Sequence, residues 1–270
     1  MIDTIFFGTP KFVTEICDSL LEINKINLAG VVTAPDKPVG RKQLLSPSPV
    51  KKWAQNHGIP AFTISDYPFS IIQPDLGVLA AYGQIIPQKI IDLFPKGILV
   101  IHPSLLPKYR GASPVQSAIL NGDTKTGCSI IKMDAKMDHG PIIYQFEEKI
   151  KPEDTSLDLY NRIFTKTGEI LKTIIPAYLE GKIIPQPQNH QQATYCRLLT
   201  KKDGYFDYNN PPEKKILDRL IRAYFPWPGV WTLWQNKRVK FLPKEMVQIE
   251  GKNPVSYQQF KKAYPEFNLL

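Results

Sequence analysis

The chain has 270 residues, of which 43% are hydrophobic, enough to bury the core of one large domain or two ordinary ones. No stretch approaches the roughly 20 apolar residues of a membrane span, and the first residues lack the features of a secretory signal. Three widely spaced cysteines suggest neither a disulfide framework nor a metal site, so we expect a cytoplasmic protein without a metal. The net charge is +9, of which +7 falls in residues 191–270. A basic segment of this kind suits a polyanion such as RNA, and a merely basic surface is the alternative.

Strands and helices alternate along the first third of the chain. Residues 2–8 predict an apolar strand, residues 12–21 have helical apolar spacing, and residues 28–33 predict a second strand. This order predicts a mainly parallel sheet with right-handed crossovers. The glycine that follows the first strand lacks the rest of a Gly-x-Gly-x-x-Gly turn, so a dinucleotide-binding fingerprint is excluded.

Residues 34–49 read as a long loop rich in proline, lysine and arginine. A loop of this length in a compact domain is usually functional or disordered. The pattern then predicts further alternation, with helices at 50–58, 88–94 and 114–121 and strands at 60–64, 76–81 and 98–101. Gly122 is expected to end the helix at 114–121.

Two polar groups follow predicted strand ends in the middle of the chain. His102 comes directly after the strand at 98–101, whose residues are all apolar and therefore suit a sheet covered on both faces. Asp138 lies in a loop after another predicted strand at 126–133. Because ligands bind at the carboxyl edge of open α/β sheets, we expect the imidazole and the carboxylate to meet there and move a proton. Two unrelated loop residues are the alternative.

The last part of the chain predicts a change of domain. A helix at 156–180 ends in Gly181, and the polar, proline-containing residues 182–196 then predict a linker. A helix at 212–225 and short strands at 231–234 and 238–242 follow, with little room for strands after residue 249 and no prediction for 253–270. We therefore expect domains at 1–181 and 197–270.

Residues 102–142 (HPSLLPKYRGASPVQSAILNGDTKTGCSIIKMDAKMDHGPI) resemble the core of the formyltetrahydrofolate-dependent formyltransferases. The turn at 82–87 (YGQIIP) and residues 225–230 (FPWPGV) also resemble segments of that family, and the resemblance covers about residues 1–245. It implies an α/β fold with a Rossmann-like, mainly parallel sheet, helices on both faces, and a small, shortened, OB-like C-terminal β-barrel. The insertion at 34–49 resembles that of the branch that formylates methionyl initiator tRNA.

The resemblance also implies the substrates and the site. The formyl donor would be 10-formyltetrahydrofolate, the acceptor methionyl initiator tRNA, and the enzyme a monomer without a metal. His102 would be the oxyanion donor, and Asp138 would keep it charged or relay a proton. Folate contacts would come from Tyr82, Gly83, Ile85, Pro87, Ser104, Leu105, Leu106 and Pro107, and tRNA contacts from Lys37, Arg41, Lys42, Arg197, Lys201 and Lys202.

One position departs from the family pattern. The family's catalytic asparagine lies two residues before the histidine, where this chain has Val100, which has no amide donor. Losing such a donor typically costs roughly 10²–10³ in rate. The enzyme is slowed, or another donor such as Asn121 or a backbone N–H replaces the amide, or the reaction is lost. We favour the first two. A nucleotide-sugar N-formyltransferase and a catalytically impaired RNA- or folate-binding homologue are the alternative functions.

Overall fold

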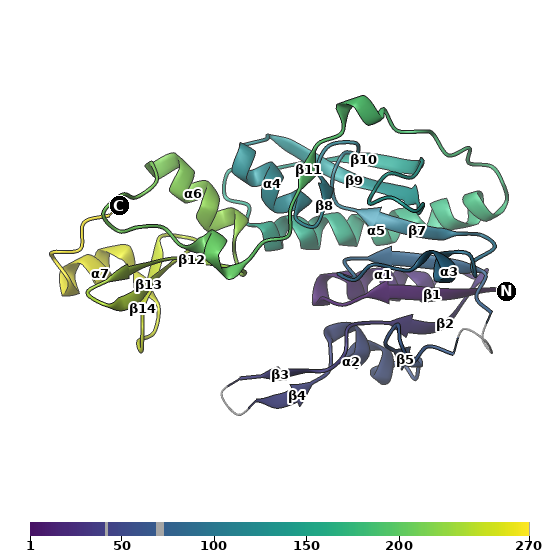
Figure 1. Cartoon of the computed structure of the whole chain (residues 1–270), viewed down its shortest axis with the longest axis horizontal. Coiled ribbons are helices and arrows are strands. Elements are labelled where there is room, and N and C mark those ends of the chain that lie inside the picture. Colours follow the sequence, from purple (N-terminus) through teal and green to yellow (C-terminus); the bar gives the residue numbers. More distant parts are fainter. Residues whose placement is uncertain (41–42, 69–72, 270) are drawn as a thin grey trace. The chain divides into compact units, whose positions relative to one another are not determined.

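The computed structural model describes residues 1–40, 43–68 and 73–269, which form two compact units (Figure 1). Unit 1 comprises residues 1–110, 127–148 and 161–195, and unit 2 comprises residues 111–126, 149–160 and 196–270. Each unit is therefore assembled from three separate stretches of the chain. None of the helices in these ranges is long and apolar enough to cross a membrane.

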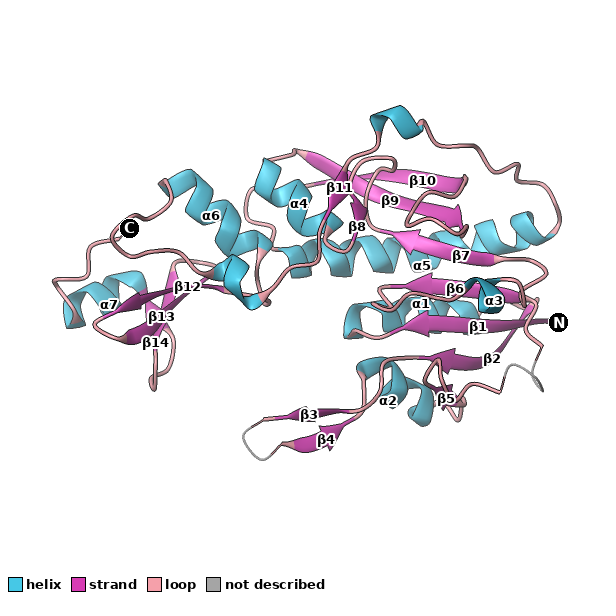
Figure 2. Cartoon of the chain, in the orientation of Figure 1, coloured by secondary structure: helices cyan, strands magenta, loops and turns pink. Residues whose placement is uncertain are grey.

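A seven-stranded sheet forms the centre of unit 1, with the strand order β10-β9-β7-β6-β1-β2-β5 (Figure 2). Neighbouring strands from β7 to β5 run parallel, whereas β7 and β9 are antiparallel, so the predicted mainly parallel sheet is confirmed. The strands are β1 (Ile2–Gly8), β2 (Ile26–Val32), β5 (Ala61–Phe62), β6 (Leu76–Ala80), β7 (Ile98–His102), β9 (Lys125–Lys132) and β10 (Ile142–Lys149).

Helices cover this sheet because its strands are apolar on both faces. Every residue of β7 is buried, as are successive residues of β1. The helical elements of the first 91 residues are η1 (Lys11–Val13), α1 (Thr14–Leu21), α2 (Pro49–Asn56) and α3 (Gln88–Ile91), and α5 (Ser156–Leu179) follows later in the chain. In unit 1, Phe12 stacks on Phe164 of α5 with ring centroids 5.3 Å apart, and Gly168 of α5 lies against Ser19 of α1.

The predicted loop at 34–49 is wrong in part, because it contains a short hairpin. Strands β3 (Lys37–Val39) and β4 (Leu44–Ser46) pair antiparallel. Leu44 and Leu45 are 67% and 72% exposed, so this hairpin buries little apolar surface. The described side chains of these two three-residue strands include no buried one, so there is no alternation of apolar and polar residues from which to predict them.

Unit 2 contains the expected C-terminal domain of antiparallel strands. Strands β12 (Val230–Trp234), β13 (Lys237–Leu242), β14 (Met246–Ile249) and β15 (Val255–Ser256) form one antiparallel sheet in sequence order. Helix α4 (Pro114–Asn121) ends at Gly122, whose φ of +72° forms the predicted glycine cap. Unit 2 also holds η3 (Lys201–Gly204), α6 (Lys214–Ala223) and α7 (Tyr257–Ala263).

The C-terminal tail completes the core of unit 2, which the sequence did not predict. Phe260 of α7 is 1% exposed and Phe267 is fully buried. The Phe267 ring lies edge-on to Trp234, with centroids 5.4 Å apart, and 5.0 Å from the ring of Phe260. The tail therefore covers the apolar face of the sheet.

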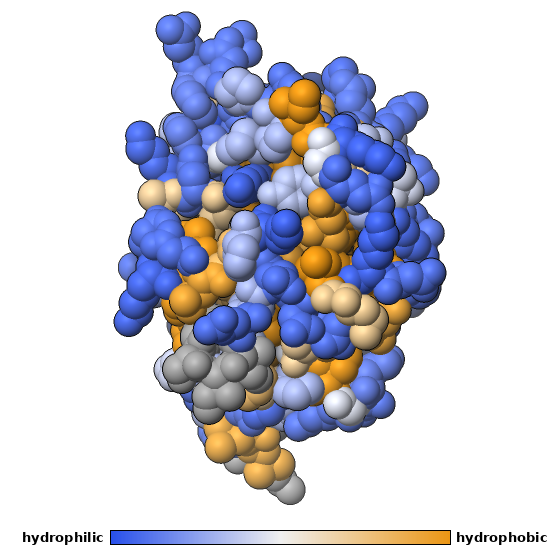
Figure 3. All heavy atoms as spheres, turned by 90° about the vertical axis from the view of Figure 1, so that its right-hand side faces the viewer, coloured by the Kyte–Doolittle hydropathy of each residue, from blue (hydrophilic) through white to orange (hydrophobic). Residues whose placement is uncertain are grey.

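Hydrophilic side chains predominate on the face of the molecule shown in Figure 3, and apolar ones form small separate patches there. This distribution agrees with the composition of the chain, in which 22% of residues are charged.

Because Phe267 is fully buried, Phe267→Ala should lower the free energy of unfolding by about 3–5 kcal/mol. Leu233→Ala is the control, because Leu233 is 48% exposed and its truncation should change stability by no more than about 0.5 kcal/mol. Urea denaturation followed by tryptophan fluorescence measures both variants. Equal stabilities would show that the tail does not contribute to the core.

Candidate active site

His102 is the last residue of β7, and its side chain is held in one orientation. The residue is 4% exposed, and Nε2 lies 2.8 Å from the backbone carbonyl oxygen of Tyr109. A carbonyl oxygen only accepts hydrogen bonds, so Nε2 carries a proton and donates it. Nδ1 is consequently the ring nitrogen that faces Asp138, at 3.4 Å from Oδ2. The structure thus brings together the two predicted side chains.

This contact has a definite electrostatic preference. With Nε2 protonated, a neutral imidazole would present the lone pair of Nδ1 to the Asp138 carboxylate, which is also an acceptor. A proton on Nδ1 makes the contact attractive, and so does a donor placed between the two groups. The pair is therefore arranged to share or relay a proton.

The loop that carries Asp138 connects β9 to β10 and is tightly constrained. Asp138 has a φ of +49°, a left-handed conformation that aspartate tolerates better than most residues. A Cβ at Gly140 would lie 1.8 Å from the carbonyl oxygen of Lys132, so only glycine fits there. Gln188 Nε2 donates to the carbonyl oxygens of Asp138 and Gly140, at 2.9 and 2.7 Å.

The turn after His102 is held by a serine that the sequence analysis missed. Ser129 is fully buried and pairs with His102 across β7 and β9. Its Oγ donates to the carbonyl of Ser104 at 2.7 Å and accepts from the Leu106 amide at 3.0 Å and from Gln145 Nε2 at 2.7 Å. A polar residue between Cys128 and Ile130, in the strand predicted at 126–133, was the one signal for it. Ser129 and Gln145 thus shape the turn rather than react.

The predicted folate residues occupy two neighbouring turns of unit 1. Because Ala80 of β6 pairs in parallel with Ile101 of β7, residues 81–87 and His102 lie at the same edge of the sheet. Gly83, Ile85 and Pro87 are exposed, whereas the Tyr82 ring is part of the core. Burial raises the pKa of the Tyr82 phenol to about 12.

The second turn, residues 104–107, is mostly buried. Ser104 is fully buried, and its hydroxyl donates to the Lys108 carbonyl at 2.6 Å, so the hydroxyl is used within the turn. Leu106 is 4% exposed and belongs to an apolar cluster, while Leu105 and Pro107 are partly exposed.

Val100 lies on the same face of β7 as His102, because side chains two residues apart in a strand point the same way. It is 7% exposed and packs with Leu106 and Ile131. An apolar side chain in an apolar cluster thus occupies the position where the resemblance predicts the family's asparagine. Asn121, suggested as a replacement donor, is the last residue of α4 in unit 2.

The predicted tRNA contacts have different surroundings. Lys37, Lys201 and Lys202 are exposed on β3 and η3, and Arg41 and Lys42 lie outside the described residues. Arg197 is engaged with Asp203, because both terminal nitrogens of its guanidinium bind that carboxylate. The hydrogen bond from Arg197 is the main reason that the pKa of Asp203 lies well below its usual range.

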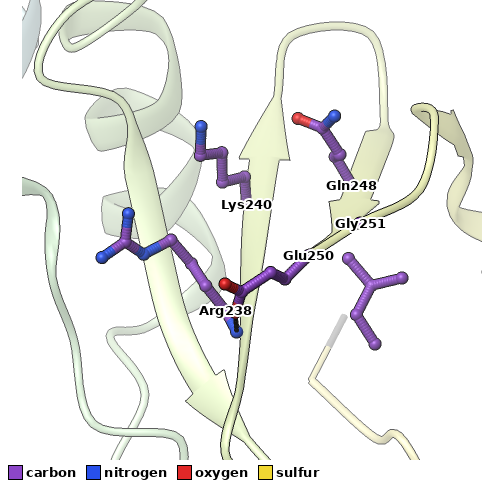
Figure 4. A pocket seen from close by; sticks show the side chains of 6 residues that line it. Arg238, Lys240, Gln248, Glu250 and Gly251 are labelled. Carbon is purple, nitrogen blue, oxygen red and sulfur yellow. Dashed lines mark hydrogen bonds between the residues drawn. The ribbon is translucent and has the colours of Figure 1, made fainter. Parts of the chain in front are cut away.

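A cationic surface on the C-terminal sheet was also missed by the sequence analysis. Arg238, Lys240, Gln248 and Glu250 line a shallow cavity of about 190 Å³ (Figure 4). The Arg238 guanidinium lies 4.4 Å from the ring centre of Trp231. Arg238 and Lys240 alternate with the buried Val239 and Phe241. This alternation in the strand predicted at 238–242 was a signal from which the cationic surface could have been predicted.

Comparison with known proteins identifies the family. The profile described as formyl transferase matches residues 2–175, and the profile of the formyl transferase C-terminal domain matches residues 198–263. The chain belongs to the formyl transferase family. The resemblance predicted from the sequence is therefore confirmed.

Relatives and solved structures of this family cover most of the chain. The methionyl-tRNA formyltransferase of Roseiflexus sp. (strain RS-1) is 39% identical over 90% of this chain and 76% of its own length. That of Chloroflexus aurantiacus (strain J-10-fl) is 38% identical over 92% of this chain and 82% of its own length.

Solved structures of lower identity share the fold. A sugar N-formyltransferase from Shewanella sp. has a TM-score of 0.70 at 19% identity, covering 90% of this chain and 97% of its own. An N-formyltransferase from Helicobacter canadensis, in complex with folinic acid and dTDP-3-aminofucose, has a TM-score of 0.66 at 19% identity, covering 92% and 95%. A methionyl-tRNA formyltransferase from Clostridium thermocellum has a TM-score of 0.63 at 21% identity, covering 94% and 96%.

Proposed function

We propose that this chain transfers a formyl group from 10-formyltetrahydrofolate to the amino group of methionyl initiator tRNA. The contact between His102 and Asp138 carries this proposal, because it puts a proton-moving pair at the carboxyl edge of a formyl transferase sheet. The curated relatives named methionyl-tRNA formyltransferase support the acceptor. We infer that the enzyme works in the cytoplasm.

The geometry limits how His102 can act. The acceptor amine attacks the formyl carbon, negative charge develops on the formyl oxygen, and the bond to folate N10 then breaks. Because Nε2 already donates to Tyr109, only a proton on Nδ1 is available to stabilise the oxyanion. Asp138, which lies beside Nδ1, accepts the proton of the attacking amine directly or through water. It then passes this proton to N10 as the bond between N10 and the formyl carbon breaks.

The turn at residues 82–87 fits a pterin through its backbone. Gly83 has a φ of +79°, and a Cβ placed on it would meet nothing within 4 Å, so a flat ring has room to approach the main chain there. Exposed Ile85 and Pro87 add apolar surface beside it. Tyr82 and Ser104 are buried, and the Ser104 hydroxyl is used within its own turn, so both would support the turns from behind rather than bind the pterin through their hydroxyls.

For tRNA binding we propose exposed cations in both parts of the chain. Lys37 would act from the hairpin, and Arg41 and Lys42 are added from the sequence pattern alone. Arg197, Lys201 and Lys202 would act from the C-terminal part, where Asp203 weakens the contribution of Arg197. Arg238 and Lys240 extend this set, because a cation over a partly exposed aromatic ring is typical of a nucleic-acid surface. We retain the proposed division into a catalytic part (1–181), a linker (182–196) and a tRNA-binding part (197–270).

A catalytically impaired RNA- or folate-binding homologue is the second candidate, and Val100 is the observation that favours it. A formyltransferase acting on a nucleotide sugar is less well supported, because sugar N-formyltransferases match this chain only at the level of the fold.

The proposal predicts formyl transfer that depends on Asp138. Purified chain, 10-formyltetrahydrofolate and methionyl initiator tRNA should yield formylmethionyl-tRNA, measured by acid gel electrophoresis. Asp138→Asn keeps the size of the side chain but removes the proton acceptor, and should lower the rate by roughly 10²–10⁴. Transfer to a nucleotide amino sugar but not to the tRNA would assign the chain to the other acceptor class.

Val100→Asn tests the missing donor. The amide should raise turnover by about 10-fold or more, because it adds a hydrogen bond to the oxyanion. Folate affinity should change little. The buried amide should also lower stability by about 1–3 kcal/mol, so turnover is measured well below the melting temperature. An unchanged or lower turnover would mean that position 100 does not face the oxyanion.

Replacing Arg238 and Lys240 together by alanine tests the cationic sheet surface. If both contact phosphates, the slope of log affinity against log salt should become shallower by about 1.5, and affinity near 0.1 M salt should fall about 10-fold. Filter binding of the initiator tRNA measures both quantities. The charge-matched control replaces exposed Lys261 and Lys262 of α7. Equal effects from both pairs would indicate net charge rather than a defined surface.

A further inference from the structure

Arg110 is a buried cation that the reaction described above does not use. It opens the short strand β8 (Arg110–Gly111), is 2% exposed, and is among the largest fully buried side chains of the described residues. Taking a guanidinium out of water is costly unless strong hydrogen bonds compensate it. Here Nε and Nη2 both donate to Gln188 Oε1, at 3.2 and 2.6 Å, and Nη2 also lies 2.8 Å from His190 Nδ1.

These bonds determine which way the Gln188 amide points. A guanidinium only donates, so the amide oxygen of Gln188 must face Arg110 and its nitrogen must face away. The nitrogen has two protons, and it donates to the backbone carbonyls of Asp138 and Gly140 at 2.9 and 2.7 Å. A flipped amide would set N–H groups against the guanidinium and an oxygen against two carbonyls. Arg110 therefore orients Gln188, and Gln188 holds the Asp138 loop.

Residues 188–194 also support His102, the partner of Asp138. Thr194 Oγ1 accepts from the amide of Tyr109 at 2.8 Å, and the Thr194 carbonyl accepts from the amide of Arg110 at 2.8 Å. Tyr109 in turn supplies the carbonyl that orients His102. Residues 188–194 thus contact the supports of both members of the pair.

His190 is the second side chain that accepts a hydrogen bond from Arg110. To accept from the guanidinium, Nδ1 of His190 must be unprotonated, and the ring lies face to face with His139 at a centroid distance of 3.9 Å. Burial, followed by the neighbouring His139 and Arg110, lowers the pKa of His190, which keeps this acceptor available. His139 is itself bound through Nδ1 to Asp134 at 2.6 Å, so it is anchored within the same loop.

We propose that Arg110 and Gln188 are positioning residues that hold Asp138 at its working distance from His102. This inference rests on the proposed function, because it concerns the same pair. A displacement of about 1 Å in a reacting group can cost about 10²-fold in rate, and the 3.4 Å contact leaves little room for one. Gln188 lies in the segment that the sequence suggests is a linker, so its role depends on the fold rather than on a local motif.

Gln188→Met tests the inference without altering charge or side-chain length. The rate of formyl transfer at saturating substrates should fall about 10- to 100-fold, and KM for both substrates should stay within about threefold. Gln186→Met is the matched control, because Gln186 is exposed and its side-chain amide bonds only locally, to the Ile184 carbonyl. A Gln188→Met enzyme with unchanged kcat would overturn the inference.

A double-mutant cycle separates positioning from a general structural role. If Gln188 acts through Asp138, the change Gln188→Met should cost less than about threefold in an Asp138→Asn background. A general loss of structure predicts the same factor in both backgrounds. Equal losses would therefore contradict the inference.

Hydrogen exchange keeps the inference testable if the proposed activity is absent. Backbone amides in a peptide covering 133–141 should exchange about 10-fold faster in Gln188→Met than in the wild-type chain, because the loop loses two hydrogen bonds. Unchanged exchange would refute the positioning role whatever the activity. Faster exchange in a chain without formyl transfer would uphold it and reject the proposed function alone.

Arg110→Lys provides a second variant that keeps the buried charge. A lysine cannot donate two bonds in the fixed geometry of a guanidinium, so the Gln188 amide should lose its orientation. The expected loss in kcat lies between wild type and Gln188→Met, and thermal melting of the variant should stay cooperative. A wild-type rate in a folded Arg110→Lys protein would show that Arg110 does not act through Gln188.

Discussion

The hydrogen bond from His102 Nε2 to the carbonyl of Tyr109 determines how the candidate site can work. It assigns a proton to one ring nitrogen and directs the other, Nδ1, toward the Asp138 carboxylate. Without it the imidazole could rotate and present either nitrogen. The bond exists because β7 ends at the edge of the sheet and the following turn brings residue 109 back over the ring. A short stretch of backbone thus decides which proton is available for chemistry.

Two buried polar side chains near this pair, Ser129 and Gln188, make their hydrogen bonds within unit 1. Ser129 holds the turn after β7, and Gln188 holds the loop that carries Asp138. A buried donor or acceptor that loses its partner costs about 1–3 kcal/mol, so such networks resist rearrangement. Around them Val100, Leu106 and Ile131 form an apolar cluster. The site therefore combines a rigid polar frame with an apolar wall.

Val100 is the position at which we expect this site to differ from the family pattern. The structure shows a valine packed among apolar neighbours on the face of β7 that also carries His102. Under the proposed function, charge on a formyl oxygen would be stabilised by His102 and by the backbone, without a side-chain amide from this position. A slower reaction with intact binding is the physical consequence that the geometry favours.

The outlines of this protein follow from the sequence by itself. Apolar runs and helical spacing predicted the parallel sheet, and the Gly122 cap was readable from its residue type. The approach of His102 to Asp138 does not follow from a shared strand edge, because β9 runs antiparallel to β7 and ends beside Leu99. The position of His102 at the end of a buried strand, however, was foreseeable. These features depend on local patterns and on the general topology of α/β folds.

The tertiary structure alone decided the rest, because the interactions join residues far apart in the chain. Ser129 and Gln188 are ordinary polar residues by sequence, and only the fold places their side chains against the turn at 104–106 and the loop at 138–140. The tail had no recognisable pattern, yet Phe267 fills the core of unit 2. The short hairpin of β3 and β4 gave no periodic signal, since Leu44 and Leu45 are largely exposed. Periodicity reports which faces are buried, whereas the partner of each buried polar group depends on how distant segments pack.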